Sequence, residues 1–367
     1  MAGSVSGAGP AASAVARPAS PSRQALPLAL TMGDPAGIGL DISLSAWLER
    51  DAQGLAPFVF FGDREALAAR AQALGLDVPT TSISDPREAA NVFATRFPIC
   101  EVGCDAPVKP SEPDARNARA VVTAIDSAVL AVRDGRARAV VTNPIAKSVL
   151  MADGFTHPGH TEYLGALAAA HFGVASPNPV MLLASDELRV VPLTVHIPLA
   201  RVAGAITTAA IIATAKILYA SLTSDFGIAR PRIAVTGLNP HAGEDGRLGA
   251  EDQAIIAPAI AALARDGLDI TGPYPADTLF HAAARTTYDA VLAMYHDQAL
   301  IPIKTLAFDR GVNVTIGLPF VRTSPDHGTA FSLAGTGKAQ ATSLIEALKM
   351  ADAIAQKRER AAAAGTS

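Results

Sequence analysis

The stretch from Tyr295 to Lys338 combines residue types that could act on an anionic substrate. His296 and Asp297 follow the apolar run 290–294, which predicts a buried strand that delivers polar groups at its end. Short, mostly apolar runs separate the next polar residues, which are Lys304, Arg310, Asn313 and Arg322. A guanidinium binds phosphate or carboxylate through two hydrogen bonds and an ammonium supplies a point charge, so the segment predicts an anion site. The alternative is ordinary solvated surface charge, which the flanking apolar residues disfavour.

Three of the eight histidines lie where a strand-like run reaches a loop. His196 ends VVPLTVH, His241 lies in the turn-rich GLNPHAGEDGRLG, and His296 follows the apolar run described above. Open α/β sheets place ligand sites at such strand ends. Three neutral imidazoles can hold a divalent metal while leaving positions open for a substrate. The alternative is three hydrogen-bonded structural histidines, because no local HExxH-like pattern supports a ligand set.

His160 and Thr161 lie in HPGHTEYLG, where Pro158 and Gly159 predict a turn and a helix then runs through Ala170. Both side chains could present donors to an anion at the helix start, where backbone N–H groups also favour negative charge. An ordinary helix cap, with His160 merely packed, is the alternative.

The elements that must position these residues follow an α/β pattern. LPLALTM, from Leu26, predicts a first strand, GDPAGIG a loop, and residues 41–49 a helix. Gly33, Gly37 and Gly39 predict a tight turn before a helix N-terminus that favours anions. The spacing is neither the G-x-G-x-x-G of a dinucleotide-binding Rossmann unit nor a P-loop.

Further strands are expected at 58–61, 139–142, 180–184, 190–195, 232–236 and 290–294. Helices are expected at 117–132, 199–222, 254–265 and 341–357. This alternation predicts an α/β fold with mostly parallel strands. With 367 residues, half of them hydrophobic but only 5% aromatic, the chain should form two domains or one large α/β unit with an aliphatic core.

Composition also excludes several classes. The formal charge of −4 offers no basic face for nucleic acid, and no apolar run reaches the length of a membrane span. Cys100 and Cys104 lack nearby ligands for a zinc knuckle, so two reduced thiols and a cytoplasmic enzyme are expected. Residues 1–25 are mainly Ala, Ser, Pro and Gly and predict a disordered extension rather than a targeting signal.

Several long motifs together resemble the 4-hydroxythreonine-4-phosphate dehydrogenase family of vitamin B6 biosynthesis. They are TMGDPAGIG, TNPIAK, GHTEYL, TVHIPL, GLNPHAGEDGRLG, GPYPADTLF, YHDQALIPIK and RGVNVTIGLPFVRTSPDHGTA. The resemblance implies a fold like isocitrate and isopropylmalate dehydrogenases, with two α/β subdomains flanking a cleft. Residues 26–145 plus 298–360 would form the first, on the cofactor side. Residues 146–297 would form the second, on the metal and dimerisation side.

The resemblance further implies NAD-dependent oxidation of 4-phosphooxy-L-threonine to 2-amino-3-oxo-4-phosphooxybutanoate, which loses CO2 to give 3-amino-2-oxopropyl phosphate. A homodimer would carry the active site at the subunit interface. The implied metal ligands are His196, His241 and His296, and the implied substrate-binding residues are His160, Thr161, Lys304, Asn313 and Arg322. The segment DHGTAFSLAGTGK resembles the adenosine-binding loop of the related decarboxylating dehydrogenases. This resemblance implies a cofactor site at His327, Gly328, Thr329 and Gly335.

Asp277, in PADTLF, and Asp297 are the candidate proton-handling carboxylates, with orientation of the histidines as the alternative role. A metal would act as a Lewis acid toward the hydroxyl and the developing enolate. The choice among Zn, Mg and Co, and between NAD and NADP, stays open.

Rival functions are a D-threonate or D-erythronate 4-phosphate dehydrogenase of sugar-acid catabolism, a zinc phosphoester hydrolase and a non-catalytic binding protein. The first rival is separated from the biosynthetic function by comparing activity on the phosphorylated amino acid with activity on the phosphorylated hydroxy acid. Phosphate release without an NADH signal would identify the second, and the many convergent polar groups disfavour the third.

Overall fold

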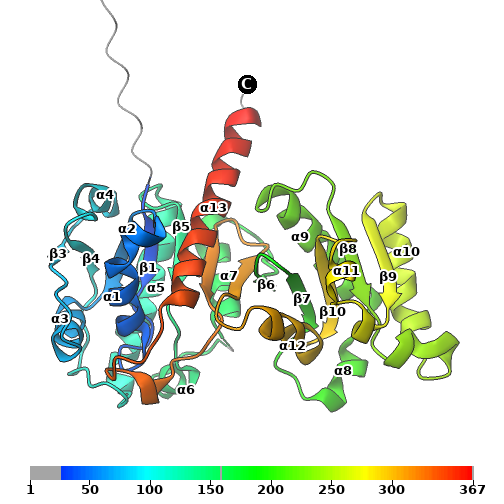
Figure 1. Ribbon diagram of the computed structural model, residues 1–367, viewed down its shortest axis with the longest axis horizontal. Helices are drawn as coiled ribbons and strands as arrows, with labels where there is room; N and C mark the ends of the chain where they lie inside the picture. The colour runs from blue at the N-terminus through cyan, green and yellow to red at the C-terminus, as the bar shows by residue number, and fades with distance from the viewer. Residues whose placement is uncertain (1–25, 158, 366–367) are drawn as a thin grey trace, which may run out of the picture.

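The computed structural model describes residues 26–157 and 159–365, and the predicted extension of residues 1–25 lies outside this part. One continuous sheet runs through the described chain, with helices packed against it (Figure 1). Its strands are β1 (Leu28–Thr31), β2 (Phe58–Gly62), β3 (Thr80–Ser82), β4 (Phe97–Glu101), β5 (Ala139–Thr142), β6 (Val180–Ala184), β7 (Arg189–Thr194), β8 (Arg232–Thr236), β9 (Asp269–Tyr274), β10 (Ala290–Tyr295), β11 (Val312–Ile316) and β12 (Arg322–Pro325).

The α-helices begin after most of these strands. They are α1 (Gly39–Leu48), α2 (Arg50–Gln53), α3 (Arg64–Ala73), α4 (Ala89–Val92), α5 (Ala118–Arg133), α6 (Lys147–Ala152), α7 (His160–Phe172), α8 (Leu199–Ala205), α9 (Thr208–Ser224), α10 (Ala257–Arg265), α11 (Ala282–Arg285), α12 (His296–Leu306) and α13 (Thr342–Gly365). Shorter helical turns are η1 (Pro86–Glu88), η2 (Ala115–Asn117), η3 (Pro240–Gly246), η4 (Asp252–Ile256), η5 (Ala276–Thr278) and η6 (Phe331–Leu333).

The strand order is β3-β4-β2-β1-β5-β12-β11-β6-β7-β10-β8-β9. The first six strands in this order, β3, β4, β2, β1, β5 and β12, pair in parallel. The last four, β7, β10, β8 and β9, also pair in parallel. The central pairs β12-β11, β11-β6 and β6-β7 are antiparallel. Three reversals leave the two parallel halves running in opposite directions, and they meet at β12, β11, β6 and β7.

The core is formed by aliphatic strands, a few aromatic rings, and helix faces that carry alanine and valine. Every residue of β1 and β2 is buried, as the unbroken apolar runs predict for strands covered on both faces. Phe58 packs edge-to-face against Phe93 and Phe97, with ring centroids 4.8 and 5.7 Å apart. The helix α5 turns its alanines and valines toward β1, β2 and β5.

The sequence predictions for the sheet are largely confirmed. The expected strands 139–142, 180–184 and 232–236 match β5, β6 and β8 residue for residue, and most pairings are parallel. Sequence patterns missed β3, β4, β9, β11 and β12, which are short or carry polar residues.

Two local predictions were wrong. The single helix expected at 199–222 is two helices, because Ile206 and Thr207 are extended and the Thr207 hydroxyl accepts a hydrogen bond from the Ala210 amide to cap α9. The loop expected at His296 is a helix: β10 ends at Tyr295, and His296 begins α12, which continues through Pro302 to Leu306.

The segment after residue 297 contacts both halves of the sheet. The helix α12 packs against β7 and β10, while β11 pairs with β6 and β12 pairs with β5. The division into subdomains at residues 145 and 297 stays a prediction.

Within residues 26–157 and 159–365, no single helix has the length and apolar character needed to cross a membrane, although α8 and α9, bent by 90°, pass that test as a pair.

Candidate active site

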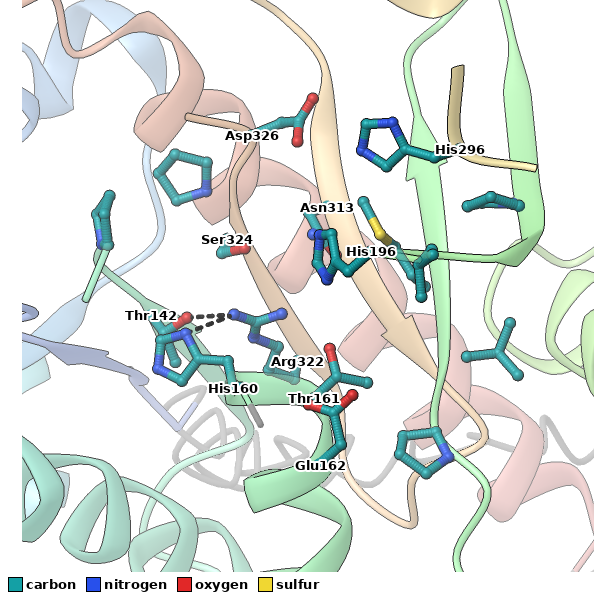
Figure 2. Close-up of a pocket in the computed structure, with 18 of the residues that line it drawn as sticks. Thr142, His160, Thr161, Glu162, His196, His296, Asn313, Arg322, Ser324 and Asp326 are labelled. Carbon is teal, nitrogen blue, oxygen red and sulfur yellow. Dashed lines mark hydrogen bonds between the residues drawn. The ribbon is translucent and has the colours of Figure 1, made fainter. Parts of the chain in front are cut away.

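A cavity of about 530 Å³ opens where the two halves of the sheet meet (Figure 2). Its walls come from the end of β5, the start of α7, and strands β6, β7, β11 and β12. The fold brings nine of the predicted site residues to this cavity: His160, Thr161, His196, His296, Lys304, Asn313, Arg322, His327 and Gly328. Arg310 is not among the lining residues and instead lies 3.6 Å from Glu187 in an exposed ion pair.

Arg322, on β12, is a buried cation without an acidic partner among the described residues. Its Nη1 donates to the Thr315 hydroxyl at 2.9 Å, and its Nη2 donates to the Thr142 hydroxyl at 2.7 Å. Its Nε is buried without a partner. Burial lowers the pKa of Arg322 to about 10. A desolvated charge held only by neutral groups is costly unless an anion joins it, so the guanidinium marks a candidate anion site.

His160 adds an unused donor to the same site. Its Nδ1 lies 3.4 Å from Arg322 Nη2 (Figure 2), and because a guanidinium can only donate, Nδ1 accepts. The neutral ring therefore carries its proton on Nε2, which is buried without a partner. Thr161 follows at the start of α7, and the Oδ1 of Asn313 is likewise buried and unpartnered. Several polar atoms thus converge with no partner in the chain.

Replacing His160 with glutamine should flatten the acid side of the stability profile. Burial, with the charges of Arg322 and Lys147, holds the pKa of His160 well below its ordinary 6.5. Below pH 6.5 the unfolded chain binds a proton that the folded chain excludes. The free energy of unfolding therefore decreases as the pH is lowered. One proton corresponds to about 1.4 kcal/mol per pH unit. Urea unfolding at several acidic pH values would give the free energy of unfolding of both proteins. Its slope against pH should be smaller for His160→Gln than for the wild type, by up to this amount. Equal slopes would contradict the assignment of His160 as a neutral, buried imidazole.

Lys304, on α12, is a paired cation. Its ammonium donates to the Asp326 carboxylate at 2.7 Å and also to the Asp326 backbone carbonyl. Asp326 follows β12 directly and lines the cavity, yet sequence reasoning did not select it. The signal was available, since an acid in SPDHG lies next to the predicted cofactor loop. The pair fixes Lys304 at one end of the cavity and offsets its charge.

His196 and His296 come together, with ring centroids 5.9 Å apart. The Asp297 carboxylate lies 2.7 Å from His296 Nδ1, which leaves Nε2 free, as in a histidine oriented for metal binding. His196 holds a left-handed backbone at φ 51°, a strained conformation that aims its ring. These two imidazoles therefore fit a divalent metal as donors.

The third predicted ligand lies elsewhere. His241 lines a second cavity of about 610 Å³, together with Asp277 and Asp297. It begins a turn in which residues 241–245 all have positive φ, five consecutive residues in the left-handed region. The Asp252 carboxylate holds the entry to this turn by accepting from the Leu238 amide at 2.8 Å. Within the described residues, no cluster of three or more His, Cys, Asp or Glu could hold a metal.

The loop predicted to bind cofactor packs against the glycine-rich loop 33–39. The Ile38 amide donates to the Thr329 carbonyl at 3.0 Å, and the Gly335 amide donates to the Asp41 carboxylate at 2.7 Å. A Cβ on Gly37 would lie 2.8 Å from the Thr329 carbonyl oxygen, so that close approach requires glycine. Of the four predicted cofactor residues, His327 and Gly328 line the cavity, while Thr329 and Gly335 hold the two loops together.

The glycine-rich loop does not line the cavity, and several of its backbone amides bond to acceptors within the protein. The Asp34 amide donates to the Pro144 carbonyl, and the Gly37 amide donates to the Asp34 carbonyl. With the Ile38 amide also bonded, these N–H groups are occupied by protein acceptors. The glycines instead permit close packing, since a Cβ on Gly39 would lie 2.5 Å from the Met32 carbonyl oxygen.

Further polar lining residues were not predicted as site residues. They include Thr142, Lys147, Glu162 and Ser324. Thr142 is the last residue of β5, and Lys147 begins α6 shortly after it, so the rule that ligands bind at strand ends could have found both.

The fold and the cation-rich cavity define an α/β protein with an active site for an anionic small molecule. The chain belongs to the family described as pyridoxal phosphate biosynthetic protein PdxA, whose model matches residues 54–351. A "4-hydroxythreonine-4-phosphate dehydrogenase" from Methylorubrum populi is 56% identical over 90% of this chain and 95% of its own length. A relative of the same name from Bradyrhizobium diazoefficiens is 55% identical over 90% of this chain and 97% of its own length.

A solved structure supports the same assignment. The crystal structure of 4-hydroxythreonine-4-phosphate dehydrogenase from Klebsiella pneumoniae superposes with a TM-score of 0.80 at 36% identity, covering 90% of this chain and all of that chain. The resemblance and the α/β fold predicted from the sequence are confirmed.

Proposed function

We propose that this protein is an NAD-dependent dehydrogenase that oxidises 4-phosphooxy-L-threonine, with loss of CO2, in vitamin B6 biosynthesis. The observation that carries the proposal is the buried Arg322, whose hydrogen-bond partners are all neutral, beside the unpartnered donor of His160. This pair is built for a multiply charged anion such as a phosphate monoester. Family membership supplies the reaction, since relatives at 56% and 55% identity carry this activity as their name.

The substrate phosphate would lie at Arg322, with His160, Thr161 and Asn313 as further contacts and Lys304 at the other end of the cavity. In this position the reacting hydroxyl extends toward His196 and His296, which Figure 2 shows on the side of the cavity away from His160. The chain's own residues therefore bind and orient the substrate between an anion site and a pair of imidazoles.

A divalent metal, Zn, Mg or Co, would be held by His196 and His296, with His241 as the third ligand. When bound, the metal would supply Lewis acidity to the substrate oxygen. Because His241 lines a different cavity from His196, we propose that a homodimer completes the site, with one copy's His241 cavity facing the other copy's imidazole pair. Exposed apolar residues beside both cavities support such an interface, namely Ile197, Leu199 and Ile301.

Asp297 would orient His296, which its 2.7 Å contact supports. Asp277 would handle protons or hold His241, since both line the second cavity. The nicotinamide cofactor, NAD or NADP, would bind on the side of residues 26–145 and 298–360, along the loop from His327 to Gly335. Both cysteines are free thiols, which is the usual state of cysteine in a cytoplasmic enzyme.

The test is NADH formation with purified protein, NAD, a divalent metal and 4-phosphooxy-L-threonine. Chelating the metal, or replacing His241 with alanine, should lower the initial rate by at least about 100-fold, as expected when a metal ligand is lost. His171→Ala is the matched control, because His171 lies on α7 and lines neither cavity. A full rate with D-threonate or D-erythronate 4-phosphate alone would assign the sugar-acid reaction instead. Absence of NADH with every phosphorylated acid would overturn the dehydrogenase proposal.

A further inference from the structure

Three Lys and Arg side chains line the cavity within the described residues, and they differ in their partners. Lys304 is paired with Asp326, and Arg322 is buried among neutral donors and acceptors. Lys147, the first residue of α6, has no hydrogen bond or ion pair with any described residue. It is therefore a lining ammonium whose charge the described chain leaves without a partner.

Gly159 opens the path by which Lys147 reaches the cavity. A Cβ built on Gly159 would lie 3.0 Å from both Cε and Nζ of Lys147 and 3.1 Å from Glu162 Oε2. The lysine stem thus passes across the glycine, directly before the start of α7. Glu162 lies on the other side of the same point without forming an ion pair with Lys147. Any side chain larger than hydrogen at position 159 would displace the ammonium.

Lys147 lies within electrostatic reach of both ends of the site. Its charge contributes to the lowered pKa of His160, next to the anion site, and to that of His196, at the imidazole pair. Lys147 lines the same cavity as both groups of residues, so a substrate that spans the anion site and the imidazole pair lies within its reach. Lys304, by contrast, is held at the far end by Asp326.

The proposed substrate carries two anionic groups that need different partners. A phosphate dianion offers three oxygens and suits the cluster of fixed donors at Arg322 and His160. A carboxylate carries one charge and two oxygens, which one mobile ammonium can satisfy as a point charge. A contact to this second anion would fix the orientation of the C–C bond that breaks when CO2 is lost.

We propose that Lys147 binds the substrate carboxylate, and so makes the site select phosphorylated acids over phosphorylated alcohols. This inference rests on the function proposed above. It assigns the carboxylate to Lys147, which among the described lining cations has no partner, rather than to Lys304 or Arg322.

The test compares two ligands that differ only in the carboxylate. Calorimetry without cofactor would measure binding of 4-phosphooxy-L-threonine and of 3-amino-2-hydroxypropyl phosphate, its decarboxylated counterpart. Lys147→Met should weaken binding of the first by about 10- to 100-fold, the value of one charge-assisted hydrogen bond, and change the second by less than about twofold. Lys147→Arg should recover most of the loss, because it restores the charge.

Two controls separate this effect from general electrostatics and from misfolding. Lys216→Met removes an equal charge outside the cavity, where Lys216 pairs with Asp266 at 2.8 Å, and should alter neither affinity. Thermal unfolding of Lys147→Met should match the wild type, since Lys147 is exposed and forms no bond within the described chain. Equal weakening of both ligands would make Lys147 a phosphate contact, and no weakening of either would make it solvated. Both results overturn the inference.

The same design distinguishes failure of this inference from failure of the proposed function. If the wild type binds D-threonate 4-phosphate and not the amino acid, the function is wrong but the carboxylate assignment remains testable. Glycerol 3-phosphate is then the decarboxylated counterpart, and Lys147→Met should again affect only the acid. If Lys147→Met weakened binding of threonate phosphate and of glycerol phosphate equally, the assignment would be overturned there as well.

Discussion

Replacing Arg322 with methionine should lower kcat/KM for the phosphorylated substrate by about 100- to 1,000-fold without destabilising the protein. The guanidinium is the buried donor to which the phosphate would bind, and loss of two charge-assisted hydrogen bonds accounts for this factor. In the free protein the same cation is held only by the Thr315 and Thr142 hydroxyls and His160. Its desolvation is therefore uncompensated, and a methionine of similar length removes that cost.

The measurement combines steady-state kinetics with urea unfolding. The free energy of unfolding of Arg322→Met should equal or exceed that of the wild type, whereas activity should collapse. Arg310→Met is the matched control, because Arg310 lies outside the cavity in an exposed pair with Glu187, and its kcat/KM should stay within about twofold. A variant that keeps its activity, or that loses activity only because it unfolds, would show that Arg322 is structural.

Replacing Arg70 with methionine should destabilise the fold by about 3–5 kcal/mol, the usual result of breaking a buried ion pair. Arg70, on α3, is 2% exposed and pairs with Asp41, which is 3% exposed. Its guanidinium also donates to the Gly37 carbonyl at 3.0 Å and to the Pro35 carbonyl at 3.1 Å. Asp41 in turn accepts from the Gly335 amide, so one pair ties α1, α3 and two loops together.

Urea unfolding of the single and double variants would measure this contribution. Arg70→Met leaves the Asp41 charge buried and unpaired, so adding Asp41→Leu should recover part of the lost stability. Arg119→Met is the control: its pair with Asp105 is exposed, and its loss should cost less than about 1 kcal/mol. A loss for Arg70→Met as small as that of the control would refute a structural role for the pair.

The sequence predicted the fold better than it predicted the roles of charged residues. Apolar runs located β5, β6 and β8 residue for residue, because a strand buried on both faces is apolar along most of its length. Short polar strands escaped detection: β12 begins with Arg322, a residue that on its own indicates surface. Tertiary pairing with β5 and β11 makes this segment a central strand.

The residue types of the site, and the anionic chemistry they imply, were determined by the sequence alone. Which cations are free was decided by the tertiary structure, because the environment of a charge depends on residues far away in the chain. Arg322 meets Thr142, 180 positions earlier, whereas Lys304 meets the acid that offsets it. The same reason separates His241 from the imidazole pair of His196 and His296. It also leaves Lys147, which was not predicted as a site residue, without a partner among the described residues.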